Sequence, residues 1–276
     1  MSKREEYGIQ LKPLIIKSES AFRELKDILI FNSNLPGARG NLELAYAFAD
    51  SLKEMQYIDD KLWLTLNEWA GVASEDTPSD SPQEFIPFCA VQALGAIFKC
   101  VDFEKKEKII ELLQAAANDS RWRVREAVAI GLQWIEENDF RQAELIFNKW
   151  IDDDASILEK RAIIAALAHP PVLNEKDNVL FCFKITERIL KDIINLGREI
   201  RKTEEFRVLR KGLEYAISVF VAKLPTEGFD LMKEWAQKND PDIKKIIKSN
   251  LGKSRLTKKF GHQVNEVFVV LNGNSA

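Results

Sequence analysis

Histidine is nearly absent from this sequence, and its scarcity limits the chemistry that the chain can encode. Only two histidines, His169 and His262, occur in 276 residues. Histidine is the side chain most often used for acid–base catalysis near neutral pH and for zinc binding. His169 precedes two prolines, so we expect it at the end of a helix, where the helix dipole favours it. No nucleophile-elbow, zinc-protease, Walker or dinucleotide-binding motif occurs. We therefore predict no catalytic residue, no metal site and no cofactor.

The acidic run Asp152 to Asp154 has the residue types of a metal site. Glu159 follows it, but the spacing is not that of a calcium-binding loop. Carboxylates beside the first turn of a helix accept hydrogen bonds from free N–H groups and interact favourably with the helix dipole. We expect this run to lie where a helix begins and to cap it.

The loop from Leu35 to Asn41 places glycines and an arginine directly before a predicted helix. Helix N-termini bind anions through their free N–H groups. Arg39, Gly40 and Asn41 are therefore candidates for an anion contact. A tight turn in which Asn41 caps the helix explains the same residues, and we favour this interpretation.

Basic residues gather near the end of the sequence, in a stretch without carboxylates: Lys244, Lys245, Lys248, Lys253, Arg255, Lys258 and Lys259. One interpretation is the solvated outer face of a terminal repeat. The other is a surface for phosphate groups, nucleic acid or an acidic partner. A smaller basic group, Arg121, Arg123 and Arg125, surrounds Trp122 and could join this interaction surface.

Five of the six tryptophans separate into two groups. Four lie among apolar positions of predicted helices and are expected in the core: Trp63, Trp134, Trp150 and Trp235. Trp122 follows a turn and is the best candidate for an exposed aromatic ring.

Composition excludes a general attraction to polyanions, because 40 Lys and Arg stand against 43 Asp and Glu. The three cysteines, Cys89, Cys100 and Cys182, lie in apolar stretches and form no C-x-x-C pair, which predicts buried, reduced thiols. The charged start, Met1 to Glu6, does not resemble a signal peptide, and no apolar run approaches the roughly 18 residues of a membrane span. We expect a soluble cytoplasmic protein with no membrane association.

Apolar residues recur at spacings of three and four through nearly the whole sequence, which predicts an all-α fold of short amphipathic helices. The expected helices are 18–31, 41–55, 58–71, 84–100, 104–117, 121–136, 139–151, 155–168, 176–196, 203–223, 227–238 and 241–251.

The predicted helix 121–136 has an unusually wide apolar face. It carries two adjacent apolar stripes, one of Val124, Val128, Leu132 and Ile135 and another of Ala127, Ile130 and Trp134. Such a face is too wide for a helix with a single partner. It is typical of a helix between its hairpin mate and the neighbouring repeats of a solenoid.

Internal similarity supports repetition. Segment 118–132 matches segment 239–251 in its Asn-Asp turn, its apolar–basic pair and a leucine eight residues after the apolar residue. Arg121 and Trp122 are extra residues in the first copy. Looser copies begin at Asp152 and at Ala90.

These positions resemble the HEAT-repeat pattern, in which an Asp turn precedes an apolar–Arg pair that opens the second helix of a hairpin: Asp119, Val124, Arg125, Ala127 and Leu132. The resemblance implies a right-handed α-solenoid of about six irregular HEAT-like helical hairpins. The Asp would cap the helix N-terminus, and the basic residue would reach the carboxylate of a neighbouring turn.

The expected organisation is a single domain, 1–276. It comprises degenerate N-terminal helices (1–72), a flexible acidic loop (73–83), HEAT-like repeats (84–255) and a capping tail (256–276) that contains a last helix or a short strand.

The resemblance implies a non-enzymatic scaffold that binds a protein or peptide partner through its concave surface. The closing segment, Trp235 to Leu256, is also similar to the end of bacterial HEAT-like proteins, a group that includes DNA-alkylation-repair glycosylases. That second similarity implies a DNA-binding protein as the alternative.

Overall fold

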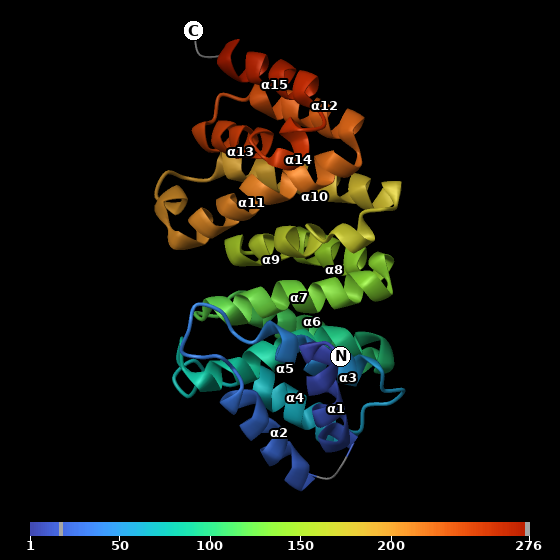
Figure 1. The fold of residues 1–276 in the computed structure, drawn as a ribbon. Coiled ribbons are helices and arrows are strands. Elements are labelled where there is room, and N and C mark those ends of the chain that lie inside the picture. Colours follow the sequence, from blue (N-terminus) through green and yellow to red (C-terminus); the bar gives the residue numbers. More distant parts are fainter. Residues whose placement is uncertain (17–18, 274–276) are drawn as a thin grey trace. The chain divides into compact units, whose positions relative to one another are not determined.

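A computed structural model describes residues 1–16 and 19–273, and the regular elements in this part of the chain are all helical (Figure 1). The predicted all-α class is confirmed. Contacts between residues group the chain into two compact units, Met1–Ile146 and Phe147–Ala276. The single domain expected from the sequence stays a prediction.

Unit 1 contains seven α-helices and two short 3-10 helices in its described residues. Their bounds are α1 Lys3–Ile16, α2 Glu19–Phe31, α3 Leu42–Lys53, α4 Asp60–Ala70, η1 Pro82–Glu84, α5 Phe85–Ile97, η2 Phe98–Cys100, α6 Phe103–Ala117 and α7 Trp122–Asn138. The next helix, α8 Phe140–Asp152, contains the division between the units.

Unit 2 continues with seven α-helices and two 3-10 helices in its described part. They are α9 Ile157–Leu167, η3 Pro170–Val172, α10 Lys176–Asn195, η4 Ile200–Lys202, α11 Glu204–Lys223, α12 Pro225–Ala236, α13 Pro241–Leu251, α14 Ser254–Thr257 and α15 Gly261–Gly273.

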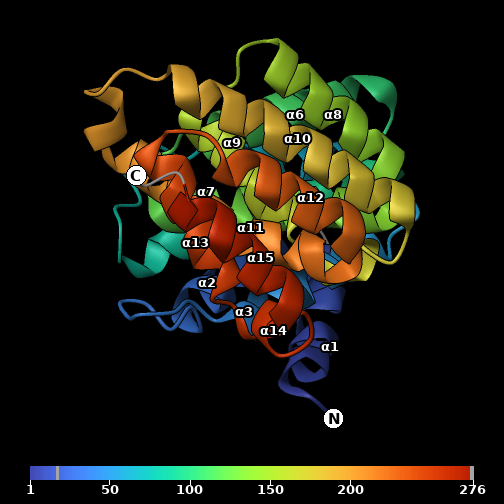
Figure 2. The ribbon, with the colours of Figure 1, turned by 90° about the horizontal axis from the view of Figure 1, so that it is seen from above.

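The predicted helices agree with these elements except at the two ends of the sequence. Helix α1 was not among the expected helices; it contains Pro13 and buries Leu11 and Leu14. The predicted helix 18–31 begins at a residue outside the described part of the chain. The tail forms helix α15 rather than a strand, and it packs on α12 in unit 2 (Figures 1 and 2).

Alternate helices of unit 1 contact one another in succession: α1 packs on α3, α3 on α5, and α5 on α7. Helices α4 and α6 also contact their neighbours α5 and α7. Every residue of α5 is buried, since this helix has partners on all sides. A helix apolar all round is the expected result of this arrangement.

Unit 2 repeats the same order of contacts. Helix α9 packs on α11, and α11 packs on α13. Helix α12 contacts α11, α13 and α15. In both units, therefore, successive alternate helices lie side by side.

Two glycines allow α5 and α7 to approach at the level of their backbones. A Cβ atom on Gly95 would lie 2.6 Å from the Cα atom of Gly131 and would clash with the Gly131 carbonyl group. A Cβ atom on Gly131 would meet the Val91 carbonyl oxygen at 3.1 Å. The spacing between these helices therefore requires glycine at position 95.

We predict that Gly95→Ala lowers the free energy of unfolding by about 1–3 kcal/mol or more, because the added methyl group must push two backbones apart. Gly212→Ala is the matched control, since a Cβ atom there meets only Ile164 Cγ2 at 3.8 Å. Within helix α11 this control should be neutral or stabilising by up to about 1 kcal/mol. Urea denaturation of both variants tests the difference. Equal stability of the two variants would contradict the close backbone contact.

Candidate functional site

A pocket of about 320 Å³ lies in unit 1 at the N-terminal ends of α3 and α7. We call it the Trp122 pocket. It is lined by the loop residues Ala38, Arg39 and Gly40, by Leu42 of α3, by Phe88 of α5, and by Trp122, Arg123, Glu126 and Ile130 of α7. The structure thus brings the predicted anion loop together with the predicted exposed tryptophan, although more than 80 residues separate them in sequence.

Arg123 holds this pocket together. Its guanidinium donates to the Gly37 carbonyl oxygen at 2.6 Å and to the carboxylates of Asp80 and Glu84 at 2.6 and 3.0 Å. The same group lies 4.4 Å from the centroid of the Trp122 ring. One buried cation therefore fastens two loops to α7 and supports one face of the tryptophan.

Arg121 has a similar internal role. Its guanidinium donates to both carboxylate oxygens of Asp119 at 2.9 and 2.6 Å, to the Val72 carbonyl oxygen at 2.9 Å, and to Thr77. The side chain is 2% exposed. Burying a charged guanidinium has a large desolvation cost unless hydrogen bonds and an opposite charge offset it. The contacts of Arg121 provide both.

The prediction that Arg121 and Arg123 belong to an exposed interaction surface is therefore wrong. Both side chains are buried because loop carbonyl and carboxylate groups surround them. Arg125 is half-buried and donates to the carbonyl oxygens of Asp119 and Ser120 at 2.6 and 2.9 Å. Both acceptors belong to the turn that precedes α7. Trp122 is 45% exposed, as predicted.

The acidic loop 73–83 is held by these arginines. Arg121 binds Thr77, which is 7% exposed, and Arg123 binds Asp80. The Asp80 amide donates to Oε2 of Glu84, directly after the loop, at 2.8 Å. These contacts tie the loop to α7 and to η1, while the predicted flexibility of 73–83 stays a prediction.

Asn41 caps α3, as the favoured interpretation of its loop predicts. Its Oδ1 accepts from the Leu44 amide at 3.2 Å, and its Nδ2 donates to Tyr7 Oη and to the Asn32 carbonyl oxygen at 3.1 and 2.8 Å. Asn41 is therefore occupied. Arg39 is exposed and has no ion-pair partner among the residues that the structure describes.

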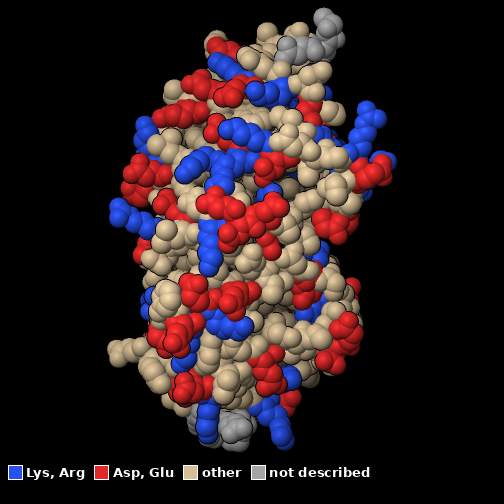
Figure 3. Space-filling model, turned by 180° about the vertical axis from the view of Figure 1, so that it is seen from behind, with Lys and Arg blue, Asp and Glu red and all other residues tan. Residues whose placement is uncertain are grey.

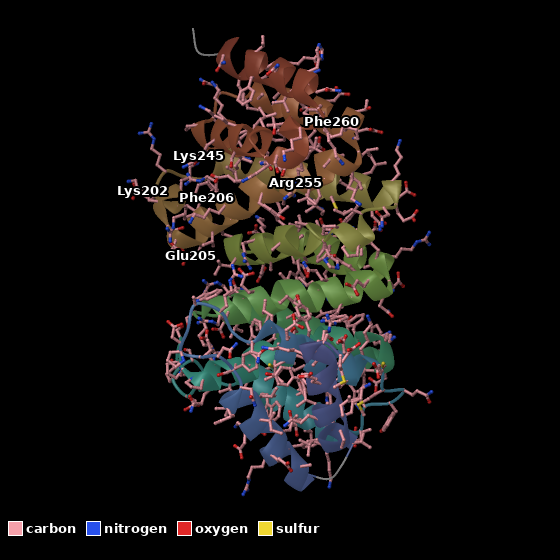
Figure 4. The ribbon with its side chains drawn as sticks, viewed as in Figure 1. Lys202, Glu205, Phe206, Lys245, Arg255 and Phe260 are labelled. Carbon is pink, nitrogen blue, oxygen red and sulfur yellow. The ribbon has the colours of Figure 1, made fainter. Side chains whose placement is uncertain are left out.

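The second candidate surface lies in unit 2 and is called the lysine surface: Lys244, Lys245 and Lys248 of α13, Lys253, Arg255 of α14, Lys258 and Lys259. Helices α13 and α14 are in contact, and Figure 4 shows Lys245 and Arg255 on them. Within the described residues, none of the six lysine amines forms an ion pair. The Arg255 guanidinium lies 4.5 Å from the centroid of the half-exposed Tyr215 ring.

Asp240 caps the helix that carries three of these lysines. Its Oδ1 accepts from the amides of Asp242 and Ile243 at 2.9 and 3.0 Å. Its Oδ2 lies 2.7 Å from the Arg201 guanidinium, which also reaches Asp242. The capping role predicted for the Asp turn is realised here.

Asp119 does not make the corresponding cap. Its Oδ1 accepts from the Arg121 amide at 2.7 Å, one residue before α7 begins, and α7 has no side-chain cap. The extra residues Arg121 and Trp122 displace the carboxylate from the helix amides. The amide hydrogen bond to Asp119 therefore closes a turn before the helix.

The acidic run Asp152 to Asp154 is placed differently from the prediction. It begins at the last residue of α8, and Ser156 with Glu159 forms the capping box that opens α9. Asp152 pairs with Arg188. No group of three or more His, Cys, Asp or Glu side chains in residues 1–16 and 19–273 could hold a metal ion.

Charges on the face drawn in Figure 3 are mixed, with basic and acidic side chains interspersed.

Three of the four tryptophans expected in the core are buried, namely Trp134, Trp150 and Trp235. The fourth, Trp63, is half-buried. The three cysteines form no disulfide in the described part of the chain, and Cys89 and Cys182 are buried. Burial raises the pKa of Cys89 well above its usual 9.0.

Glu136 on α7 is a buried acid that the sequence analysis missed. Its side chain is 2% exposed, and neither carboxyl oxygen has a hydrogen-bond partner in the described part of the chain. Burial raises the pKa of Glu136 well above 4.5, and the neighbouring Glu137 adds to this effect. The group is therefore neutral in the folded chain over a pH range in which it ionises in the unfolded chain.

We predict that this carboxyl destabilises the fold as pH rises above 4.5. In that window the unfolded chain releases a proton that folded Glu136 retains. The free energy of unfolding therefore falls by about 1.4 kcal/mol for each pH unit. Glu136→Gln should remove this dependence and be more stable than wild type at pH 7. Denaturant titrations from pH 4 to pH 8 measure the effect, with the exposed Glu68→Gln as control. A parallel pH dependence in the two variants would show that Glu136 ionises normally.

No helix in the described residues combines the length and apolar character needed to cross a membrane. No family model matches the chain, and no curated protein sequence matches it.

Proposed function

We propose that the chain is a non-enzymatic HEAT-like repeat protein that binds a protein or peptide partner. In this proposal its hairpins form a right-handed α-solenoid of about six irregular repeats. The observation that carries the proposal is the order of helix contacts, in which α1, α3, α5 and α7 pack in succession, as do α9, α11 and α13. Repeat proteins present the side chains of such a helix layer to partners.

Both candidate surfaces include residues of these alternate helices. Phe88 of α5 and Trp122 of α7 line the pocket of unit 1. Lys245 and Lys248 are exposed on α13 of unit 2. We further propose a cytoplasmic location, which is supported by three cysteines that form no disulfide in the described residues.

The expected outcome is that the full chain, used as bait in crosslinking from native extract, recovers a defined protein partner. Trp122→Ser or the pair Lys245→Glu and Lys248→Glu should remove that partner, because each alters an exposed layer position. Arg198→Glu is the control, since Arg198 is exposed and forms no ion pair among the described residues. Recovery of no partner, or of the same proteins with all variants, would overturn the proposal. Turnover of a small molecule by the purified chain would also overturn it.

Nucleic-acid binding is the second candidate function, and the lysine surface favours it. Its six lysines are not neutralised by any carboxylate of the described residues. Unpaired amines close together in sequence could contact successive phosphates and release counterions.

If this second function is correct, the chain binds duplex DNA with an affinity that falls steeply with salt. The logarithm of the binding constant should change by about 0.9 per contacted phosphate for each tenfold change in salt. Lys245→Glu combined with Lys248→Glu should reduce both the affinity and this slope, whereas Arg198→Glu should not. Fluorescence titrations at several salt concentrations measure both quantities. Absence of binding, or binding that ignores salt, would exclude this function.

A further inference from the structure

The Trp122 pocket combines an apolar wall with an unpaired cation. Trp122 and Leu42 are 45% and 43% exposed, although both are large apolar side chains at the start of a helix. Phe88 is 4% exposed and Ile130 is half-buried, so the apolar surface extends inward from the rim. Exposed apolar side chains around a concavity mark a recognition site more strongly than scattered ones.

Arg39 is the charged group of the pocket on which recognition of an anion would depend. The single positive charge of Arg123 is already shared by two carboxylates, Asp80 and Glu84, although its buried Nε has no hydrogen-bond partner among the described residues. Glu126 already has an interaction of its own within the chain. Arg39, by contrast, is exposed and without an ion pair in the described residues. A carboxylate is the natural partner for this free guanidinium.

The volume limits the size of the occupant. About 320 Å³ lies at the lower end of the range of ligand pockets, roughly 300–1,000 Å³. A single bulky side chain fits such a space better than a large cofactor does. The uncapped N-terminus of α7 adds a positive potential beside Trp122.

We propose that the Trp122 pocket binds an acidic segment of a partner protein through one bulky apolar side chain. That side chain lies against Leu42 and Trp122, and a neighbouring carboxylate of the segment pairs with Arg39. This inference rests on the proposed protein-binding function and names the chemistry of its partner. It also assigns Arg39 a role in recognition, whereas Asn41 of the same loop has the structural role of capping α3.

The experiment uses the full chain and three matched sets of short fluorescent peptides with blocked ends. One set carries a central Phe, Trp or Leu flanked by Asp or Glu. The second set has Lys in place of the acids, and the third has Ala in place of the apolar residue. Fluorescence anisotropy should show binding of members of the first set only.

Arg39→Ala and Trp122→Ala should each weaken binding of the acidic peptides by about tenfold or more. The first removes the proposed ion pair with the peptide carboxylate, and the second removes the proposed apolar contact. Arg198→Ala is the matched control for loss of an exposed guanidinium and should bind like wild type. Circular dichroism and thermal unfolding verify that the variants fold, and Arg39→Lys should restore part of the affinity.

Three outcomes would overturn the inference. These are no binding by any acidic apolar peptide, equal or tighter binding of the Lys set, and unchanged affinity in Arg39→Ala. The proposed function is decided separately, by recovery of a partner from extract. A partner lost only in the lysine-surface variant would support the function while overturning the role of the pocket.

Discussion

At Gly95 and Gly131 the backbones of α5 and α7 touch, and the order of unit 1 depends on this contact. A side chain at position 95 would have no space, since it would meet the backbone of the opposite helix. The contact sets the separation of Phe88 on α5 from Trp122 and Ile130 on α7. These three residues line the same pocket, so its width follows from the helix crossing.

Buried guanidinium groups extend that order to the loops. Arg121 and Arg123 stand at the start of α7. Arg121 binds the carboxylate of nearby Asp119 and carbonyl groups of the distant Val72 and Thr77. Arg123 binds the distant Asp80 carboxylate and the Gly37 carbonyl group. Removing one partner of such a pair would leave an uncompensated buried charge, at a cost of about 3–5 kcal/mol. The loops are therefore held in position before any ligand arrives. Such preorganisation reduces the entropy that binding must overcome.

Two similar segments show how a small insertion changes the use of one residue. Asp240 caps α13 through the amides of Asp242 and Ile243. Asp119 has the same place in its segment, but Arg121 and Trp122 intervene, so it binds the Arg121 amide and side chain instead. The inserted pair supplies one wall of the pocket and the cation that anchors loop 73–83.

The sequence by itself determined the helices from α2 to α13, because apolar spacing and turn residues act over neighbouring positions. It located the cap at Asn41, the exposed ring of Trp122 and the buried Trp134, Trp150 and Trp235. It did not show that Arg121 and Arg123 are buried, since the loops that cover them, at Val72 and Asp80, are distant in sequence. Only the tertiary structure joined Arg39 to Trp122 and buried Glu136 without a partner in the described residues. Burial and ion pairing depend on tertiary contacts between helices and loops that are distant in sequence. The local spacing of residues does not encode those contacts.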